Sequence, residues 1–485
     1  MSRILPSGRK LEQARRSRDA RFDGRFFIGV RTTGIYCRPI CPVKMPRAEN
    51  VTFFDSPSAA AEAGFRPCLR CRPESSPGTP AWRGSSATVV RALRLINDGA
   101  LDEDSLVGLA ERLGVTARHL SRLFAKHLGA APKTVAQTRR LQFAKKLIDE
   151  TRLPMTEIAL SSGYGSVRRF NDHFRQVYDR SPTQLRAGKG RGSIGSVELS
   201  IPFRKPYDFS SLLDFYSVRA IPGVETVLFS AGANKQRQYV RQFQIGSSVG
   251  RVTVQEADND LLCCRVEGAD VDDLMSVVQR VRRMFDVDAL PLEINAVLAA
   301  DDGLRPLINQ NPGLRLPGAF DEFEIAVRAI VGQQVSVKGA TTVMGGIAKK
   351  YGTVTSMGLV FPSADRLADI DPSALPMPQK RALAIKELSR QIATDTLRFD
   401  QDETEFLASL LRIPGIGPWT SQYILMRAQG DPDAFLHGDL VLKKAALSLF
   451  GSADERGLIA RAEAWRPWRG YAGMHLWRYA GDQKL

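Results

Sequence analysis

A helix–turn–helix pattern is the clearest hydrophobic periodicity in the chain. Residues 106–113 place apolar side chains at the i, i+3, i+4 and i+7 positions of one helix face, and Gly114 follows where that helix would end. Thr116 is suited to cap a second helix. We expect this second helix to bury Leu120, Leu123 and Phe124 and to turn Arg118, Ser121 and Arg122 outward.

The pattern occurs a second time between residues 155 and 174. Residues 155–160 predict a first helix, residues 163–165 a glycine turn, and residues 166–174 a second helix. The second helix would bury Phe170 and Phe174 and expose Arg168, Arg169 and Asn171. Two such motifs in tandem favour a domain that reads successive segments of the DNA major groove. A helical bundle with solvated arginines is the alternative.

Composition divides the chain further. Residues 76–86 and 187–193 are rich in Gly, Ser and Pro without a hydrophobic period, which is typical of linkers. Strands are predicted at 251–254 and 261–266, and a helix at 272–285; from Pro312 onward the periodicity is helical almost throughout. We therefore predict four domains, at residues 1–77, 86–187, 197–308 and 309–483.

Charge favours a polyanionic partner, with a basic protein that is simply well solvated as the alternative. The formal net charge is +16, and the first 50 residues hold twelve Lys and Arg against four Asp and Glu. The chain has no run of about 18 apolar residues, and its start lacks the apolar core of a signal peptide. We expect a cytoplasmic protein that does not enter a membrane.

Four cysteines form two closely spaced pairs, Cys37-x3-Cys41 and Cys68-x2-Cys71. This spacing fits one tetrahedral zinc site with four thiolate ligands. The other two cysteines, Cys263 and Cys264, are adjacent, so a disulfide framework is disfavoured. Because a zinc-bound thiolate is also a nucleophile, the spacing alone leaves open a structural or a reactive site.

The residues around these motifs resemble known families. Phe27–Pro42 carries the signature of the N-terminal domain of the Ada family, and Gly163–Phe174 followed by Ser181–Arg186 is similar to the end of an AraC-type DNA-binding domain. The resemblance covers residues 1–187. It implies that Cys37 accepts a methyl group from a DNA methylphosphotriester in a single turnover, that Cys41, Cys68 and Cys71 complete the zinc site, and that methylation creates a transcription activator. The implied partners are damaged and promoter double-stranded DNA and RNA polymerase.

One Ada feature is missing. The second methyl-accepting centre of that family uses a Pro-Cys-His-Arg motif, which does not occur in this chain. Cys263 and Cys264 lie in an apolar run that predicts a strand with buried thiols. We therefore expect no repair of O6-alkylguanine.

A glycine hairpin stands between two helical runs at Pro414-Gly415-Ile416-Gly417. Glycines have no side chain to cover their backbone N–H groups, and exposed N–H groups can bind a DNA phosphate. A hairpin that packs only against protein is the alternative.

This hairpin, with Asp439 following 22 residues after Gly417, resembles the helix–hairpin–helix DNA glycosylases, and among them the AlkA-type DNA-3-methyladenine glycosylase II. Residues 329–336 and 466–471 also match, and the resemblance spans about 197–480. It implies that Asp439 stabilises the oxocarbenium sugar and orients water, although an aspartate before an apolar run is also a common N-cap. Trp419, Tyr423 and Trp477 occupy the aromatic positions of the base pocket, where the alternative is ordinary core packing.

Two substitutions refine this resemblance. Relatives that also cleave the strand carry a lysine where this chain has Trp419, so we expect a monofunctional glycosylase. The residue that inserts into the base stack is leucine in AlkA, whereas Gln334 stands here. No C-terminal cysteine cluster is present for an iron–sulfur centre.

The expected fold is multidomain: a small α/β zinc domain, an all-α AraC-type double helix-turn-helix domain, an α+β AlkA-like N-terminal subdomain and an all-α helix–hairpin–helix glycosylase domain. The expected function is an adaptive response to DNA alkylation. Two alternatives stay open: a transcription regulator whose glycosylase-like half is an inactive DNA clamp, and a repair enzyme whose N-terminal half only recruits DNA. The oligomeric state is not predicted.

Overall fold

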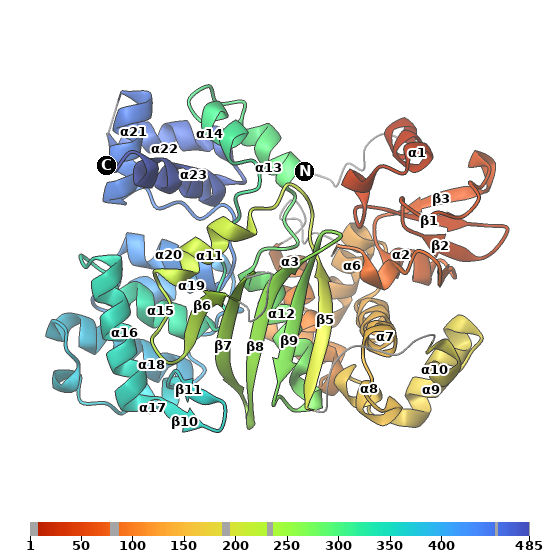
Figure 1. Cartoon of the computed structure of the whole chain (residues 1–485), viewed down its shortest axis with the longest axis horizontal. Helices are drawn as coiled ribbons and strands as arrows, with labels where there is room; N and C mark the ends of the chain where they lie inside the picture. Colours follow the sequence, from red (N-terminus) through yellow and green to blue (C-terminus); the bar gives the residue numbers. More distant parts are fainter. Residues whose placement is uncertain (1–7, 78–86, 187–194, 230–235, 452–453, 485) are drawn as a thin grey trace. The chain divides into compact units, whose positions relative to one another are not determined.

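The computed structural model describes residues 8–77, 87–186, 195–229, 236–451 and 454–484. The chain forms two compact units: Met1–Phe203 with Asn259–Gln279, and Arg204–Asp258 with Arg280–Leu485 (Figure 1). From residue 78 on, the first predicted linker lies outside the described residues, as does the whole of the second.

The first unit begins with a small α/β domain, here called the cysteine domain (residues 8–77). Its four strands have the order β3-β1-β2-β4, with β1 antiparallel to β2 and β3, and β2 parallel to β4. Leu11, Phe26 and Ile28 form a core on one side of this sheet. The elements are α1 (Gly8–Ser17), η1 (Ala20–Phe22), β1 (Phe27–Val30), β2 (Ile35–Cys37), η2 (Ala48–Asn50), β3 (Val51–Phe54), α2 (Pro57–Glu62), β4 (Arg66–Pro67) and η3 (Pro73–Ser75).

A helical domain of residues 87–186 follows and confirms the tandem helix-turn-helix prediction. Thr116 caps the second helix of the first motif by accepting from the His119 N–H, and Gly114 turns the chain with a φ of +71°. Leu123, predicted to be buried, is only half-buried because it lies at the edge of the inner face. The helices are α3 (Ala87–Asn97), α4 (Ala100–Glu103), α5 (Leu106–Arg112), α6 (Ala117–Leu128), α7 (Pro132–Glu150), α8 (Met155–Ser161), α9 (Val167–Tyr178) and α10 (Pro182–Leu185).

The strands after residue 195 confirm the predicted α+β character of that region. In the first unit, β5 (Ser196–Pro202) pairs antiparallel with β9 (Leu261–Glu267). In the second unit, three strands form an antiparallel meander, in which alternate side chains of β7 and β8 are buried. The elements of this region are α11 (Phe209–Ser217), β6 (Glu225–Phe229), β7 (Arg237–Ile245), β8 (Ser248–Ala257), η4 (Val271–Asp273) and α12 (Leu274–Met284).

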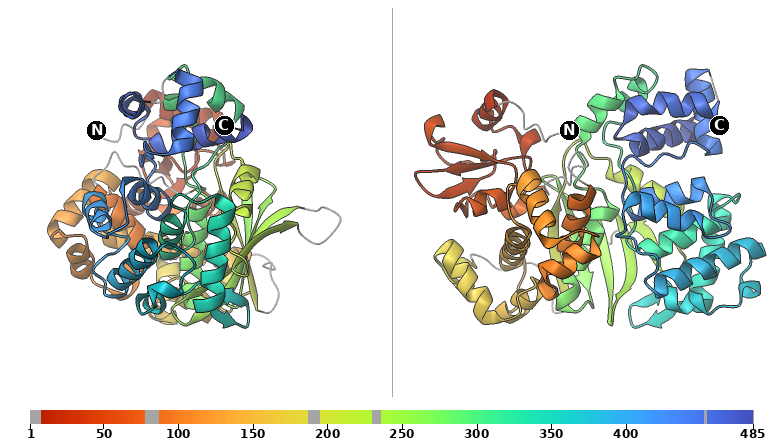
Figure 2. Two further views of the ribbon diagram at one scale, coloured as in Figure 1. Left: turned by 90° about the vertical axis from the view of Figure 1, so that its left-hand side faces the viewer. Right: turned by 180° about the vertical axis from the view of Figure 1, so that it is seen from behind.

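The rest of the second unit is helical around one large hydrophobic core. Helix α15 packs against α20, and α21 packs against α23. Figure 2 shows this largely helical region in teal and blue. A short hairpin, β10–β11, departs from the almost wholly helical prediction. The elements are α13 (Pro291–Leu298), α14 (Arg305–Gln310), α15 (Glu322–Val331), α16 (Val337–Tyr351), β10 (Thr353–Thr355), β11 (Gly358–Val360), α17 (Ala364–Ala368), η5 (Pro372–Ala374), α18 (Gln379–Ala393), α19 (Glu403–Leu411), α20 (Pro418–Ala428), α21 (Leu440–Phe450), α22 (Glu455–Ala462), η6 (Glu463–Trp465) and α23 (Arg469–Asp482).

A buried ion pair fixes the meander to the helices of the second unit. Arg241 on β7 donates from Nη1 to Glu324 Oε1 of α15 at 3.0 Å, and its Nη2 bonds the other oxygen. Both side chains are buried. Because an unpaired buried charge is costly, this contact holds α15 in place, and α15 in turn packs against α20 of the candidate active site.

The two cysteines outside the N-terminal cluster do not both have buried thiols. They lie on strand β9 as predicted, and Cys264 is fully buried, with burial raising its pKa. Cys263 is only half-buried, and its Sγ lies 3.5 Å from Glu198 Oε1. The prediction was wrong for Cys263 because successive side chains of a strand point to opposite faces.

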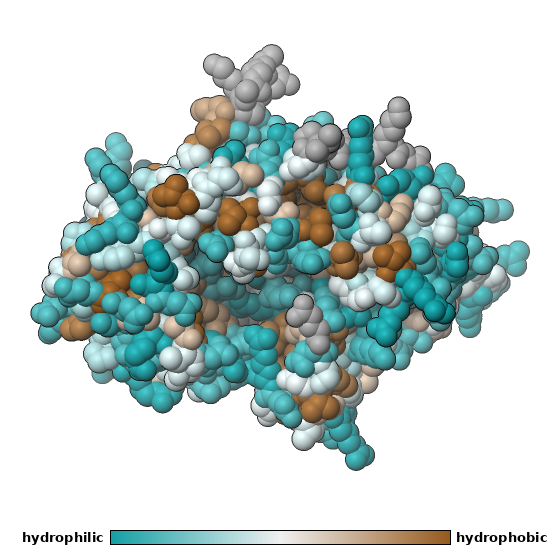
Figure 3. Space-filling model, turned by 90° about the horizontal axis from the view of Figure 1, so that it is seen from below, coloured by the Kyte–Doolittle hydropathy of each residue, from teal (hydrophilic) through white to brown (hydrophobic). Residues whose placement is uncertain are grey.

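Hydrophilic side chains cover much of the surface in Figure 3, interrupted by separate hydrophobic spots. Among the helices of the described ranges, none has both the length and the apolar character needed to cross a membrane.

Candidate metal centre and candidate active site

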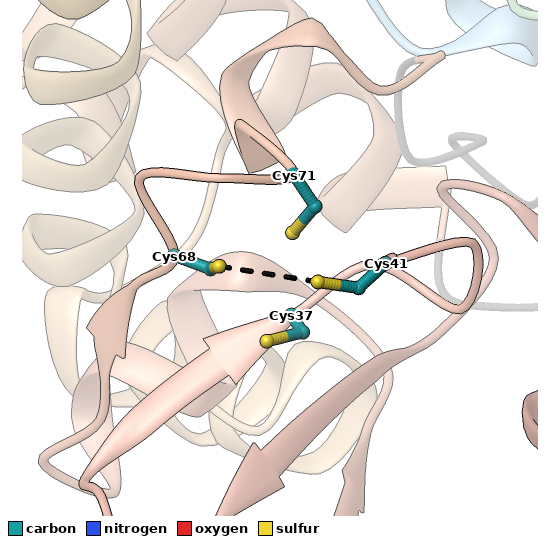
Figure 4. A group of neighbouring side chains, drawn as sticks. All are labelled: Cys37, Cys41, Cys68 and Cys71. Carbon is teal, nitrogen blue, oxygen red and sulfur yellow. Dashed lines mark hydrogen bonds between the residues drawn. The ribbon is translucent and has the colours of Figure 1, made fainter. Parts of the chain in front are cut away.

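The four cysteines of the cysteine domain converge on one point (Figure 4). Cys37 ends strand β2 and Cys41 follows in the next turn, while Cys68 and Cys71 lie between β4 and η3. Their sulfurs all lie within 4.8 Å of one another, and the Sγ atoms of Cys41 and Cys68 are 4.0 Å apart. Zinc–sulfur bonds of about 2.3 Å in a tetrahedron place sulfurs about 3.8 Å apart, so the cluster fits zinc and is too open for a disulfide.

Backbone N–H groups support three of the four thiolates. The N–H of Arg38 donates to Cys71 Sγ at 3.3 Å, and the N–H groups of Val43 and Cys71 donate to Cys41 and Cys68. The Arg38 guanidinium also bonds the Cys71 carbonyl at 3.1 Å. The interactions that act most on Cys37 are the three other sulfurs and burial.

Removing one ligand tests the zinc site directly. We expect Cys41→Ser to lower bound zinc from one ion per chain to nearly none and to loosen the cysteine domain, because metal binding and folding are coupled in such small sites. Zinc can be measured by elemental analysis of the purified chain. Cys263→Ser is the matched control; zinc retained by Cys41→Ser, or lost equally by the control, would contradict the assignment.

The segment after the last ligand contacts helix α7. Arg72, next to Cys71, forms a 2.5 Å ion pair with Asp149 of that helix. Glu74 lies 3.8 Å from Lys145 of the same helix. Sequence analysis missed these contacts because their partners lie far apart in the chain.

The residues predicted to contact DNA lie on the second helix of each helix-turn-helix motif. Arg118 and Arg122 of α6 and Arg168 and Arg169 of α9 are exposed, whereas Ser121 and Asn171 are half-buried. The hydroxyl of Ser121 donates to the Ala117 carbonyl, four residues earlier in the same helix, at 2.9 Å.

In the second unit, Asp439 receives four hydrogen bonds. Its Oδ1 accepts from the N–H groups of Val441 and Leu442 at 2.9 and 3.0 Å, which caps helix α21. The indole of Trp419 donates to Oδ2 at 2.9 Å, and the indole of Trp477 donates to Oδ1 at 3.1 Å. The N-cap that sequence analysis named as an alternative is therefore present, and two indoles fix the carboxylate as well.

The three predicted pocket aromatics are brought together. Trp419 and Tyr423 of α20 stack, with ring centroids 5.2 Å apart and an interplanar angle of 18°. Trp477 of α23 reaches them through its bond to Asp439. Sequence analysis did not predict that Trp419 and Trp477 also orient the carboxylate, because the spacing of residues along the chain does not say which acceptor an indole N–H will meet.

The glycine hairpin lies between α19 and α20, as predicted. Gly415 is exposed with a φ of +97°, and Gly417 begins α20 as its N-cap residue. Gln333, which sequence analysis did not single out, bonds both the Gly415 carbonyl at 2.8 Å and Thr420 Oγ1 at 2.9 Å. Gln334 is exposed at the turn between α15 and α16, with a φ of +52°. The side chain of Gln333 thus connects the turn that contains Gln334 to the glycine hairpin.

Three family models match the chain in the order of these sites. They are the metal-binding domain of Ada at residues 10–74, a helix-turn-helix domain at 109–188 and the AlkA N-terminal domain at 198–321. The match over residues 10–74 includes all four clustered cysteines, which confirms the prediction of one zinc site.

These comparisons define a class: a zinc-binding Ada-type domain and a helix-turn-helix domain joined to an AlkA-type glycosylase fold in one chain. The chain belongs to the family of the probable bifunctional transcriptional activator/DNA repair enzyme AlkA of Mycobacterium tuberculosis, with 42% identity over 478 residues, covering 96% of this chain and 95% of that protein. DNA-3-methyladenine glycosylase 2 of Escherichia coli is 33% identical over 293 residues, which cover 59% of this chain and 98% of that protein.

A solved structure supports the fold of the C-terminal part. The 3-methyladenine DNA-glycosylase from Archaeoglobus fulgidus aligns with a TM-score of 0.50 and 18% identity over 58% of this chain and 97% of its own. At this identity the likeness concerns the fold.

Proposed function

We propose that the chain senses and repairs alkylated DNA. Its N-terminal half takes a methyl group from a DNA methylphosphotriester and becomes a transcription activator, and its C-terminal half is a monofunctional glycosylase that removes 3-methyladenine and other alkylated bases. The observation that carries the proposal is the carboxylate of Asp439, which two backbone N–H groups and two indole N–H groups hold in place beside stacked aromatic rings.

Cys37 is the proposed methyl acceptor. Its sulfur attacks the methyl carbon of the phosphotriester; the S–C bond forms as the C–O bond breaks, and an ordinary phosphodiester anion leaves. Zinc, when bound by the four cysteines, keeps their sulfurs ionised at neutral pH. Residue exposure does not distinguish the four cysteines, each of which is 6–7% exposed. Backbone N–H bonds at Cys41, Cys68 and Cys71 reduce the nucleophilicity of those sulfurs, which favours Cys37.

Methylation removes one negative charge from the cysteine domain. A DNA phosphate is then approached with less repulsion, so promoter affinity rises and the double helix-turn-helix domain is held on DNA. Recruitment of RNA polymerase by the bound activator completes the proposed switch.

Asp439 is the proposed catalytic residue of the glycosylase. Alkylation at N3 or N7 makes a purine cationic, so it leaves without a general acid. The carboxylate stabilises the positive sugar that remains and orients the attacking water. Trp419 stands where a strand-cleaving relative carries a lysine, and an indole forms no Schiff base. An N-cap alone would need only the two backbone bonds, so the two indoles favour this role over an inactive DNA clamp.

Purified full-length chain incubated with methylated duplex DNA tests the function. We expect release of free 3-methyladenine, measured by chromatography, with the abasic strand left uncut. No base release would overturn the glycosylase proposal, and strand cleavage would overturn its monofunctional character.

Helix α9, the second helix of the second helix-turn-helix motif, gives a separate DNA-binding prediction. Replacing both Arg168 and Arg169 by alanine should lower affinity for duplex DNA and reduce the slope of log affinity against log salt by about two, one for each lost phosphate contact. Fluorescence anisotropy at several salt concentrations measures both quantities. Arg390→Ala on α18 is a matched control, because Arg390 is exposed and pairs only with Glu387 and its own helix. Unchanged salt dependence in the double variant would exclude α9 from the DNA interface.

A further inference from the structure

Three arginines converge on one buried tyrosine of the second unit. Tyr423 of α20 lies under the ring of Trp419, and its hydroxyl oxygen accepts from Arg427 Nη1 at 2.7 Å. Arg427 follows one turn later on the same helix and is buried. Arg219, after α11, and Arg328 of α15 act on Tyr423 through their positive charges.

The oxygen of Tyr423 meets only donors. A guanidinium has N–H groups and no acceptor, so the bond from Arg427 requires the tyrosine oxygen to accept. Within the described parts of the chain, no acceptor for the phenolic proton lies at hydrogen-bond distance. A phenol would therefore bury an unpartnered O–H, whereas a phenolate would be satisfied by its neighbours.

The positive charge of the cluster is also not offset by a carboxylate. The second Nη of Arg427 bonds the Gly318 carbonyl at 3.0 Å, Arg328 bonds the Arg219 carbonyl, and Arg219 Nη1 bonds the Phe215 carbonyl at 3.2 Å. The Arg219 and Arg427 guanidiniums lie 3.8 and 4.8 Å from the Phe215 ring centroid. Among the residues that the structure describes, no carboxylate pairs with any of the three arginines. Buried charges of one sign require a counter-ion, and Tyr423 is the group in position to be one.

The pKa shifts agree with this geometry. Burial raises the pKa of Tyr423, but the charges of Arg427, Arg219 and Arg328 lower it by more than burial raises it. The pKa of Tyr423 therefore lies below the ordinary value of a tyrosine. Burial lowers the pKa of Arg219 to about 10, and the neighbouring positive charges of Arg427 and Arg328 lower it as well, while Tyr423 opposes the shift.

Tyr216 of α11 provides an internal comparison. Its hydroxyl donates to the carbonyls of Met284 at 2.6 Å and Gly318 at 3.3 Å, and burial raises its pKa, so it is a phenol. Arg427 also acts on Tyr216 and lowers its pKa, whereas the carboxylates of Glu225 and Asp286 raise it. Helix α19 also packs against α20, and the carboxylates of its first turn, Glu403 and Glu405, are exposed.

We propose that Arg219, Arg328 and Arg427 hold Tyr423 as a phenolate, and that this buried negative charge makes the neighbouring site select cationic, alkylated purines over neutral ones. The selectivity rests on the proposed glycosylase function; the phenolate does not. Tyr423 stacks directly on the indole of Trp419, which bonds Asp439, so the charge attracts a cationic base and enriches the aromatic pair in electrons. The arginines are positioning residues that act through Tyr423.

A near-ultraviolet titration of the full-length chain tests the phenolate. We expect the difference spectrum between wild type and Tyr423→Phe to show tyrosinate absorption at neutral pH. Tyr216→Phe, the matched control, should leave that absorption unchanged. Tyrosinate that appears only at the ordinary tyrosine pKa of about 10 or above would overturn the proposal.

The role of the arginines has its own measurement. Arg427→Met should raise the pH at which the Tyr423 tyrosinate appears by on the order of one unit, since it removes one positive neighbour. If circular dichroism shows that this variant is unfolded, Arg219→Met, which is only half-buried, serves instead. An unchanged titration in the folded variant would contradict the proposal.

Selectivity is read from the release of cationic 7-methylguanine. Tyr423→Phe should slow release by on the order of 10-fold. In wild type, lowering the pH through the pKa of Tyr423 protonates the phenolate and should slow release, and the variant should lack this fall. Identical pH profiles in the two proteins would remove the selectivity claim. If wild type releases no base, the glycosylase function fails, whereas the titration still decides the phenolate.

Discussion

Replacing Asp439 by asparagine is expected to lower the rate of 3-methyladenine release by at least about 100-fold while the fold is kept. Loss of one preorganised charge in an active site typically costs this much. Asparagine is itself a good N-cap, so Val441 and Leu442 keep an acceptor. Its amide nitrogen cannot accept from the indole of Trp419, and we expect a loss of about 1–3 kcal/mol in the free energy of unfolding from that unpaired donor.

Asp454→Asn is the matched control for this variant. Asp454 caps the neighbouring helix α22 by accepting from the Gly457 N–H at 2.9 Å. The same substitution there should leave base release within about twofold of wild type, because an exposed N-cap contributes mainly to helix stability. Equal activity of Asp439→Asn and Asp454→Asn would reduce Asp439 to a helix cap, and the glycosylase half would then be the inactive DNA clamp.

The second large effect is expected at Cys37. Exposure of the wild-type chain to DNA that carries methylphosphotriesters should add the mass of one methylene group per chain, because no step regenerates the thiolate. Mass spectrometry of the intact chain gives the stoichiometry, and peptide mapping locates the methyl group on Cys37. The same treatment should raise promoter affinity, since the cysteine domain loses one negative charge.

Cys37→Ser should acquire no methyl group and should show no gain in affinity, whereas Cys263→Ser should behave like wild type. A methyl group mapped to Cys41, Cys68 or Cys71 would contradict the choice of acceptor. Methylated protein with unchanged promoter affinity would instead leave the N-terminal half as a recruiter of DNA without a switch.

Local patterns predicted most of the helices and the metal cluster. The 3.6-residue periodicity and the capping residue Thr116 defined the first helix-turn-helix motif, because these signals are contained in a few neighbouring residues. The metal cluster could likewise be predicted from the four cysteines, because zinc ligands commonly occur in closely spaced pairs. The β10–β11 hairpin was missed because its strands are only three residues long, too short for an alternating pattern to stand out.

Contacts between distant segments could not be predicted in the same way. Asp439 was identified from its separation from the hairpin in the sequence, but the indole of Trp477, which also holds its carboxylate, comes from another helix. The arginines around Tyr423 come from α15, α20 and the turn after α11, and nothing in their local sequence distinguishes them from solvated arginines. Charge clusters of this kind are created by tertiary packing.

The most direct test of the whole account uses one DNA duplex that carries both methylphosphotriesters and methylated purines. Methyl groups on the protein and free bases in solution are counted in the same reaction for wild type, Cys37→Ser and Asp439→Asn. We expect wild type to give both products, Cys37→Ser to release bases without acquiring a methyl group, and Asp439→Asn to acquire the methyl group without releasing bases. Loss of both products in either folded variant, or base release by Asp439→Asn at the wild-type rate, would contradict the assignment of two separate repair chemistries to Cys37 and Asp439.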